Sequence, residues 1–450
     1  MKKVLFATTA LVALGLNAPL VTSAQAQDKA ASVKPISISI GGYFRAFAIA
    51  GWQDDGQRDN GIFNVSPTGV VTPVAPTSSP IRSHGIGRES EIHFRGETAL
   101  NNGLRVGVQV ELEGETSADQ IDNTYLYFQH ASYGRVIVGE DFGSSVKTHK
   151  GVVGLPVGIT SVAHFASHAT FSGKLNTAGG GGSINTFMIL DGVNDKLIYD
   201  TPRIFGFRLS GSYTPDDKAA GSGTPVGASG QGLNPEQNGF GSVSQVWTVS
   251  GDYINNFGGL GLATSAGYQR GYREYDAIGR DIGNDPDSWN VGLELSYAGF
   301  RVGGAYKQIN NNIAAVSNPG ARGFVGERFR NGIVARNLVE GKREDFIVGA
   351  DYTFGPWTFG VSYGFASQHD VRVRDGVGAV RRTTDDLNQW TVGASYTLGP
   401  GITLFGGYYG FDIEGACRGV SGDGTGTTRL NRTCASNDGH MFLLGTQLNF

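Results

Sequence analysis

The sequence predicts an all-β fold, a transmembrane antiparallel up-and-down β-barrel of 16 strands. Three observations support it: apolar and polar residues alternate along the chain, aromatic residues stand at the ends of the apolar faces, and short turns alternate with long polar connections. Successive side chains of a strand point to opposite faces, so alternation gives one apolar and one polar face. A membrane barrel strand needs this arrangement, because lipid covers its outer face and water its inner face.

The alternation is clearest at residues 289–297. Its apolar face consists of Trp289, Val291, Leu293, Leu295 and Tyr297. Aromatic residues at both ends match the two interfaces of a bilayer, and the aliphatic residues between them match its hydrocarbon core. The same pattern recurs at 247–253, 346–352 and 390–396, which indicates that one type of strand is repeated along the chain.

Gly and Pro mark a tight reversal after several of these strands, as at residues 298–299, 355–356 and 399–401. The other connections are long and polar, and we expect loops at 142–194 and 368–386 among them. Turns on one side and loops on the other are typical of outer-membrane barrels. The sixteen expected strands are 37–52, 89–100, 103–113, 122–131, 134–141, 195–201, 205–214, 243–255, 258–269, 287–298, 300–310, 344–354, 357–367, 387–398, 401–412 and 439–450.

A secreted β-sandwich or propeller is the soluble alternative. Such folds bury the apolar face of each strand in a core, and they do not need aromatic residues at both strand ends. Their strands also tend to be shorter than the roughly ten residues that a tilted membrane strand requires. The pattern therefore favours the barrel, which forms one domain because a closed sheet cannot be divided without exposing edges.

Residues 1–26 are expected to be a signal peptide. Lys2 and Lys3 precede an apolar run over residues 4–16, and Ala24-Gln25-Ala26 provides a small-x-small cleavage pattern. A transmembrane anchor is the alternative, but the run is short and an asparagine and a proline follow it closely. Residues 27–450 then form the mature barrel. The net charge of −4 gives no reason to expect a nucleic-acid partner.

Two cysteines, Cys417 and Cys434, lie near the C-terminus in a segment rich in Gly, Ser, Thr and Asn. Because an exported chain meets an oxidising compartment, we expect a disulfide that closes a surface loop rather than two free thiols.

Two stretches resemble the Gram-negative general porin family. Tyr199-Asp200-Thr201-Pro202, followed by Phe205-Gly206-Phe207, is similar to that family's sixth strand, turn and seventh strand. The C-terminal alternation that ends at Phe450 resembles its assembly signal, which the barrel-insertion machinery reads. The resemblance implies a homotrimer in the lipid of the outer membrane of a Gram-negative bacterium. It also implies a water-filled pore for small hydrophilic solutes and ions, and a long third loop folded into that pore.

The third loop departs from the family pattern in its charge. Glu140 and Asp141 stand where the loop leaves the fifth strand, and its length of about fifty residues suits a constriction. Between residues 142 and 190 there is no acidic residue, whereas Lys147 and Lys150 occur there with a further lysine and three histidines. Family members commonly place carboxylates on this loop, so the resemblance does not imply a simple cation preference.

Alternation assigns charged residues to the lumen face. A charge on the lipid face near the midplane would cost about 2–4 kcal/mol, so the inward placement is favoured. These residues either pair across neighbouring strands or set the electric field of the constriction, and Arg45, Arg95 and Arg105 are the candidates for the second role. The residues placed inward are Arg45, Glu91, His93, Arg95, Glu97, Arg105, Glu111, Glu113, Lys196 and Arg208.

Other motifs are weaker. Residues 360–364 match the G-x-S-x-G motif of hydrolases, but they lie within an expected strand and no helix pattern follows. His164 and His168 have the spacing of metal ligands on a helix, without a third ligand nearby in the sequence. An acidic stretch at 54–59 is more typical of a solvated surface than of a cation site.

The sequence therefore favours passive diffusion through a pore, with no cofactor and no catalysis. A substrate-selective channel is one alternative and would differ only in its lining. An adhesin with a plugged pore is another, although no plug or stalk is apparent. An enzyme carried on a barrel would need a nucleophile, a base and an orienting group, and no such set is found.

Overall fold

The structure is a computed structural model of the chain. It describes residues 35–53, 63–65, 71–73, 83–114, 121–154, 184–216, 243–273, 285–311, 329–330, 333–334, 342–374, 380–414, 418–420, 431–433 and 437–450.

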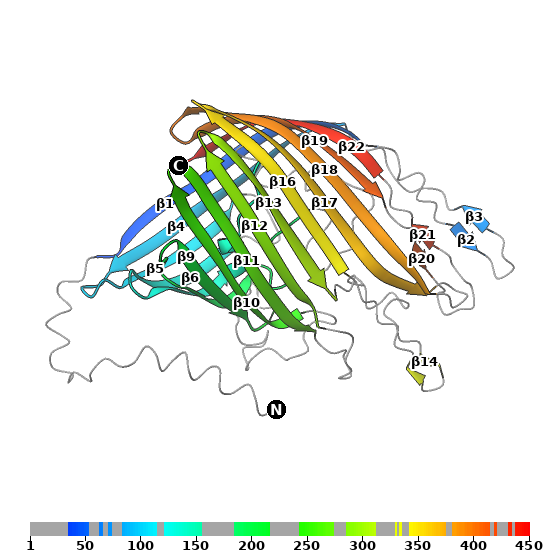
Figure 1. Ribbon diagram of the computed structural model, residues 1–450, viewed down its shortest axis with the longest axis horizontal. Coiled ribbons are helices and arrows are strands. Elements are labelled where there is room, and N and C mark those ends of the chain that lie inside the picture. The colour runs from blue at the N-terminus through cyan, green and yellow to red at the C-terminus, as the bar shows by residue number, and fades with distance from the viewer. Residues whose placement is uncertain are drawn as a thin grey trace.

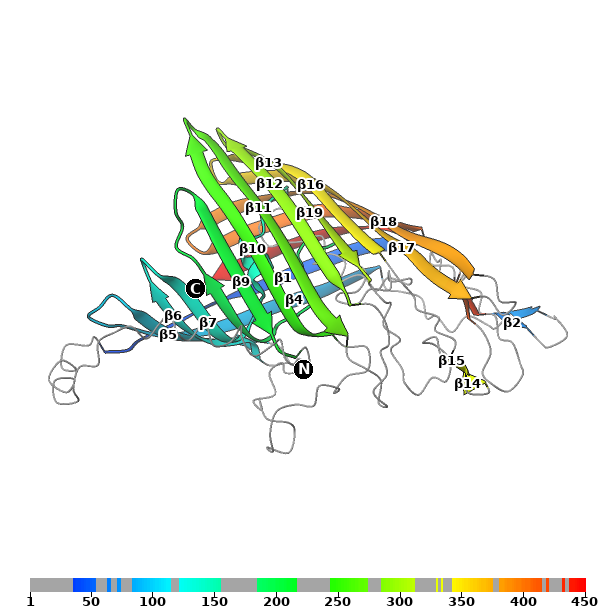
Figure 2. The same ribbon diagram turned by 60° about the horizontal axis from the view of Figure 1, so that its bottom comes forward.

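Sixteen of the described strands form a closed antiparallel barrel, which confirms the predicted fold class. Figures 1 and 2 show the tilted strands side by side as one continuous wall. The barrel strands are β1 (Ser37–Gln53), β4 (His84–Ala99), β5 (Arg105–Glu113), β6 (Ile121–His130), β7 (Gly134–Asp141), β8 (Asn194–Asp200), β9 (Phe207–Thr214), β10 (Val243–Phe257), β11 (Leu260–Arg273), β12 (Asp287–Tyr297), β13 (Phe300–Asn310), β16 (Lys342–Phe354), β17 (Trp357–Arg374), β18 (Val380–Gly399), β19 (Ile402–Glu414) and β22 (Asn437–Asn449).

The barrel closes where β1 pairs with β22. The ladder reaches the last residue of the chain, because Gly42 N–H donates to Phe450 O (3.0 Å) and Phe450 N–H donates to Gly42 O (3.1 Å). Gly42 has a φ of +152°, and a Cβ at this position would lie 2.2 Å from Glu91 O on β4. Glycine therefore permits the close approach of β1 to β4 at the seam of the barrel.

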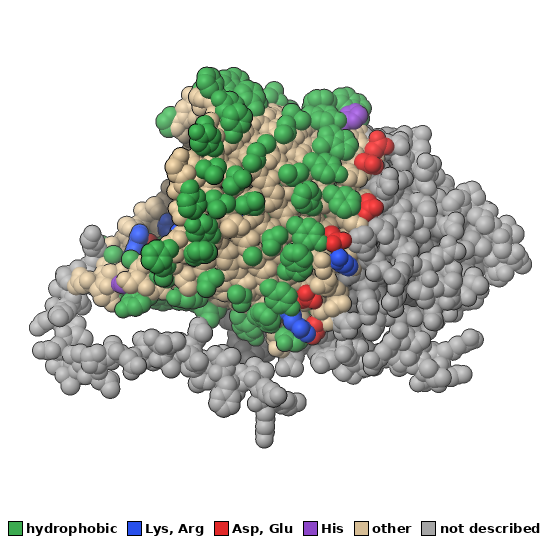
Figure 3. Space-filling model, viewed as in Figure 1, with side chains coloured by type: hydrophobic (Ala, Val, Ile, Leu, Met, Phe, Trp, Pro, Cys, Tyr) green, Lys and Arg blue, Asp and Glu red, His purple; other side chains and the backbone are tan. Residues whose placement is uncertain are grey.

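The outer face of the wall is apolar. Figure 3 shows hydrophobic side chains spread over this face and charged side chains along its edges. Val291, Leu293, Val348 and Val361 on this face are 42–50% exposed. An exposed apolar surface of this kind is what lipid would cover, and a soluble sandwich or propeller would bury it.

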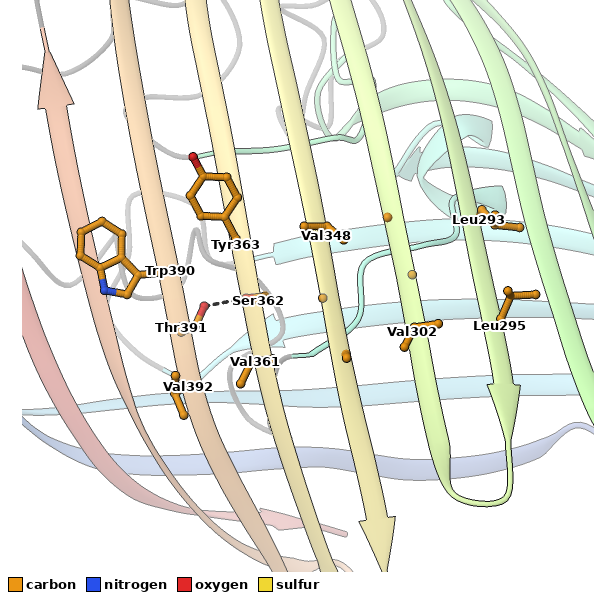
Figure 4. Close-up of a pocket in the computed structure, with 14 residues that line it drawn as sticks. Leu293, Leu295, Val302, Val348, Val361, Ser362, Tyr363, Trp390, Thr391 and Val392 are labelled. Atoms are coloured by element: carbon orange, nitrogen blue, oxygen red, sulfur yellow. Dashed lines mark hydrogen bonds between the residues drawn. The ribbon is translucent and has the colours of Figure 1, made fainter.

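An apolar groove of about 680 Å³ crosses β12, β13, β16, β17 and β18 on the outer face (Figure 4). Leu293, Val302 and Val361 line it, while Ser362 and Thr391 form a hydrogen bond to each other at 2.7 Å. Small outward residues such as Gly304 leave this hollow between the larger side chains.

Some elements were not expected from the sequence. The hairpin of β17 and β18 extends to Arg374 and Val380, so the expectation of a loop over 368–386 is wrong for most of that range. Between barrel strands, the described residues form three small two-stranded sheets and one short helix: β2 (Phe63–Val65) with β3 (Val71–Pro73), β14 (Phe329–Arg330) with β15 (Ile333–Val334), β20 (Arg418–Val420) with β21 (Asn431–Thr433), and α2 (Ser144–Thr148). None of the helices in the described part of the chain has the length and apolar character that crossing a bilayer requires.

The seam of the barrel gives a first prediction. Gly42→Ala should lower the free energy of unfolding by about 1–3 kcal/mol, because it forces an alanine into a conformation that L residues avoid and against backbone atoms of β4. The measurement is urea unfolding of the refolded barrel in lipid vesicles. Gly85→Ala on β4 is the matched control, since a Cβ there meets nothing within 4 Å. Equal effects of the two substitutions would contradict this account of the seam.

Candidate functional site

Residues 143–154, the first part of the third loop, lie along the polar face of the wall. Backbone N–H groups of this segment donate to polar side chains of three different strands: Ser144 to Ser212 on β9 (3.1 Å), Lys150 to Ser265 on β11 (3.0 Å), and Gly154 to Asp351 on β16 (3.2 Å). Because these acceptors alternate with the exposed apolar residues of the same strands, they belong to the inner face of the barrel.

Glycines of the wall allow this contact. A Cβ at Gly292, Gly349 or Gly360 would lie 2.0, 2.1 or 2.5 Å from a backbone oxygen of Lys150, Val153 or Gly154, respectively. We call Gly292, Gly349 and Gly360 the glycine track. Any larger residue there would push residues 150–154 away from the wall, so the three glycines determine how closely the loop approaches the strands.

The end of the loop contacts the same face. Asn185 N–H donates to Asp345 Oδ1 on β16 (3.2 Å), and Leu190 N–H donates to Gln269 Oε1 on β11 (2.9 Å). Ser145 Oγ donates to Met188 O (2.9 Å), which joins the start of the loop to its end. Both described parts of the loop are therefore attached to the wall and to each other.

His149 lies at the junction of these parts. Its Nε2 lies 2.9 Å from Thr186 Oγ1, and its Nδ1 accepts a hydrogen bond from Asn290 Nδ2 on β12 (3.1 Å). Burial lowers the pKa of His149 to about 4, and the positive charges of Lys307 and Lys150 contribute in the same direction. The docked loop therefore holds a neutral imidazole.

One buried carboxylate gathers three cations. The Asp252 side chain on β10 is fully buried, and Arg203 (2.6 Å), Arg208 (2.8 Å) and Lys150 (3.9 Å) surround it. We call these four residues the Asp252 cluster. The three cationic side chains remain 20–33% exposed, so the cluster presents excess positive charge to the lumen.

A second buried carboxylate has a structural role. Asp345 lies between Lys307 (3.3 Å) and Arg343 (2.6 Å), and all three side chains are at most 3% exposed. Asp345 also accepts the backbone N–H of Asn185 from the loop. Since no solute reaches these charges, they serve to position the end of the loop.

Lys196 and Lys147 are likewise used to hold the loop. Lys196 is 3% exposed and donates to the backbone oxygens of Gly192 (3.1 Å), Asn194 (2.8 Å) and Asp141. Lys147 pairs with the Asp141 carboxylate. Lys196 therefore connects the two ends of the loop, whereas Lys147 bonds within its start.

The wall formed by β1 and β4 carries two of the three arginines predicted to set the field, Arg45 and Arg95. Arg45 is 6% exposed and pairs with Glu89 (2.7 Å) while its Nε donates to Gln447 on β22 (3.1 Å). Arg95 donates to the Tyr127 hydroxyl (3.1 Å). Pairing across neighbouring strands, one of the two expected roles, is therefore present at Arg45.

The other predicted acidic and basic residues of β4, β5 and β7 lie in three places. Glu97 accepts from the Tyr127 hydroxyl (2.5 Å) and pairs with Arg105, whose side chain is 52% exposed beside the short turn between β4 and β5. Glu91 and Glu111 lie near His93 further along these strands, and Glu113 faces Glu91 across the ladder. Glu140 is buried at the end of β7.

Sequence reasoning missed several cations of this site, among them Lys307, Arg343, Arg203 and Arg135. Arg203 lies in the turn before β9, where no alternation assigns a direction. Arg135 on β7 lies over the ring of Tyr127 at 4.4 Å. Its neighbour on the same face, Ile137, is fully buried, so this strand lacks the polar inner face that would have revealed it.

The weaker motifs gain no support. Ser362 of the G-x-S-x-G match lies within β17, and its hydroxyl bonds to Thr391. His164, His168, residues 54–59, the two cysteines Cys417 and Cys434, and the expected signal peptide lie outside the described residues.

The environment of His149 predicts that loop docking weakens in acid. When the loop is detached from the wall, the His149 imidazole takes up a proton as the pH falls through its ordinary pKa of 6.5. When the loop is attached, the imidazole stays neutral until the pH reaches about 4. The free energy that favours attachment of the loop to the wall should therefore fall by about 3 kcal/mol between these two pH values. Single-channel recordings between pH 7 and pH 4 should show increasing fluctuation of the open level. In His149→Gln this pH dependence should be reduced. His130, at the end of β6, does not contact the described residues of the loop, so His130→Gln should behave as the original chain.

Comparison with known proteins places this barrel in a family. The family model described as Gram-negative porin matches residues 7–416. No curated protein sequence matches the chain.

Solved structures with the same fold are distant in sequence. The anion-selective porin from Comamonas acidovorans superposes with a TM-score of 0.52 at 15% identity, covering 92% of this chain and 100% of that chain. OmpT of Vibrio cholerae lacking loop L8 superposes with a TM-score of 0.50 at 13% identity, covering 93% of this chain and 100% of that chain. The trimer form of the same protein superposes with a TM-score of 0.50 at 12% identity, again covering 93% of this chain and 100% of that chain. The chain belongs to the Gram-negative porins, and it forms an outer-membrane channel through which small hydrophilic solutes diffuse passively.

Proposed function

We propose that the third loop narrows this channel and that solutes pass between the loop and the wall of β1, β4 and β7. The observation that carries this proposal is the contact of residues 150–154 with the glycine track, which fixes the loop backbone on the inner face. A loop attached there takes up part of the lumen cross-section, so the passage beside it limits the size of the solute.

We propose further that the passage prefers anions. The Asp252 cluster contributes three cations against one carboxylate, and its cationic side chains are partly exposed. Arg95 and Arg135 add positive charge on β4 and β7. Charges that line a narrow passage act on an ion at close range and with little screening, which favours the ion of opposite sign.

Passive diffusion needs no cofactor and no catalytic group, and we propose that the chain is not an enzyme. The substrate-selective channel and the plugged adhesin are not favoured by the family or the fold. We also propose a homotrimer, from the resemblance of the strand-turn-strand segment and C-terminus to general porins. Residues 1–26 are proposed as a cleaved signal peptide and Phe450 as the assembly signal.

We propose that Cys417 and Cys434 form a disulfide. The small two-stranded sheet of β20 and β21 pairs Arg418 with Thr433, the residues next to the two cysteines in the sequence. The compartment that an exported chain enters is oxidising, which favours a disulfide over two free thiols.

The anion preference is tested by the reversal potential of the reconstituted channel under a KCl gradient. The original chain should be selective for chloride. Lys150→Glu should shift the reversal potential toward the potassium equilibrium value, because it reverses a charge beside the passage. Lys342→Glu, at the distant end of β16, is the control and should change the potential little. A potassium-selective original channel would exclude the proposed preference.

The disulfide is tested by mass spectrometry of the exported protein after treatment with N-ethylmaleimide. Without reduction no adduct is expected, and after reduction two thiols should be labelled. Labelling of both cysteines before reduction would show that they are free thiols.

A further inference from the structure

A compact group of metal-binding side chains lies on the inner face of β4, β5 and β6. His93 and Glu111 are directly opposite each other in the β4–β5 ladder, and Glu111 is directly opposite Asn123 in the β5–β6 ladder. Glu91 is two residues from His93 and so points to the same face. One atom from each of Glu91, His93 and Glu111 lies within 4.8 Å of the others.

The carboxylates of this group are not neutralised by fixed cations. Glu91 accepts from the Tyr43 hydroxyl (2.7 Å) and contacts His93 Nε2 (2.7 Å). Within the described part of the chain, Glu111 accepts hydrogen bonds from the side-chain amides of Gln109 and Asn123 alone. Among the described residues, no lysine or arginine lies within ion-pair distance of Glu111 or Glu91. Two negative charges held together on a wall favour binding of a cation.

Asn123 provides a second, independent observation. It is 5% exposed, its Nδ2 donates to Glu111 Oε2 (2.6 Å) and to Asp122 Oδ2 (2.9 Å), and its Oδ1 has no hydrogen-bond partner among the described residues. A buried amide oxygen without a partner is costly. Rotating the amide by 180° exchanges its oxygen and nitrogen, which directs the oxygen toward the carboxylates of Glu111 and Asp122. An amide oxygen and carboxylate oxygens repel one another in that arrangement unless a cation lies between them.

From these contacts we propose that Glu91, His93 and Glu111 bind a divalent transition-metal cation of the Zn²⁺ class, with the Asn123 amide oxygen as the fourth ligand. An imidazole nitrogen with carboxylate oxygens suits Zn²⁺, whereas Mg²⁺ and Ca²⁺ prefer more ligands and oxygen alone. Ligand atoms of a Zn²⁺ ion stand about 2 Å from it and so at most about 4 Å apart. Small rotations of these partly exposed side chains complete the site.

The proposal goes beyond passive diffusion, because it makes the charge of the channel depend on a ligand. The bound ion neutralises two carboxylates of the lumen wall while His93 remains a neutral ligand. Zinc should therefore raise the preference of the channel for anions. This effect requires only an open channel and is measured on the same full-length refolded protein.

The first experiment is calorimetric titration of the refolded chain with ZnCl₂ and with MgCl₂. The original chain and His130→Gln should bind Zn²⁺ with equal affinity and Mg²⁺ much more weakly. His93→Gln and Glu111→Gln should each weaken Zn²⁺ binding by about tenfold or more, and Asn123→Leu by about tenfold. Unchanged affinity in both His93→Gln and Glu111→Gln would overturn the proposal, as would equal binding of Mg²⁺ and Zn²⁺.

A second experiment needs no substitution. Zn²⁺ should protect His93, but not His130, from modification by diethylpyrocarbonate, as mapped by peptide mass. Absence of protection would overturn the proposal even if a variant failed to fold. In planar bilayers, Zn²⁺ should shift the reversal potential of the original chain toward chloride and leave that of His93→Gln unchanged. Conductance without zinc tests the channel itself, so failure of the two proposals can be distinguished.

Discussion

The need to pair every backbone N–H and C=O inside a bilayer governs the structure. Lipid offers no hydrogen bonds, and an unpaired peptide group there costs several kcal/mol. A sheet meets this requirement only when its first and last strands pair, and β1 and β22 do so up to Phe450. Closure leaves an apolar face for lipid and a polar face for water, and the lumen, the loop contacts and the charge clusters are arranged on that polar face.

The loop contacts show how a rigid wall positions a long connection. The glycine track removes side chains where the loop backbone lies, and Asp351, Ser265 and Ser212 supply acceptors for its N–H groups. Buried ion pairs gain little net stability from their charges, because desolvation offsets the attraction. Their value at Asp345 is geometric, since that carboxylate also binds the loop backbone.

Much of the fold was predictable because a barrel strand has a period of two and both faces are set by solvent. That rule placed all sixteen strands and directed Arg45, Lys196 and Arg208 inward. It could not tell which charge would pair, because pairing depends on the register between strands distant in the sequence. Arg203 was missed since a turn has no period. The glycine track was missed because glycine is neither polar nor apolar, and Gly occurs 70 times in the chain.

The bond between Arg45 and Gln447 spans 402 positions of the sequence. The first strand therefore has no second neighbour until the last strand has been made and exported. Contacts at such separations are entropically costly to form and slow to appear during folding. A chain that lacked β22 would keep two open edges and unpaired peptide groups, so the barrel can close only after this strand has been made and exported.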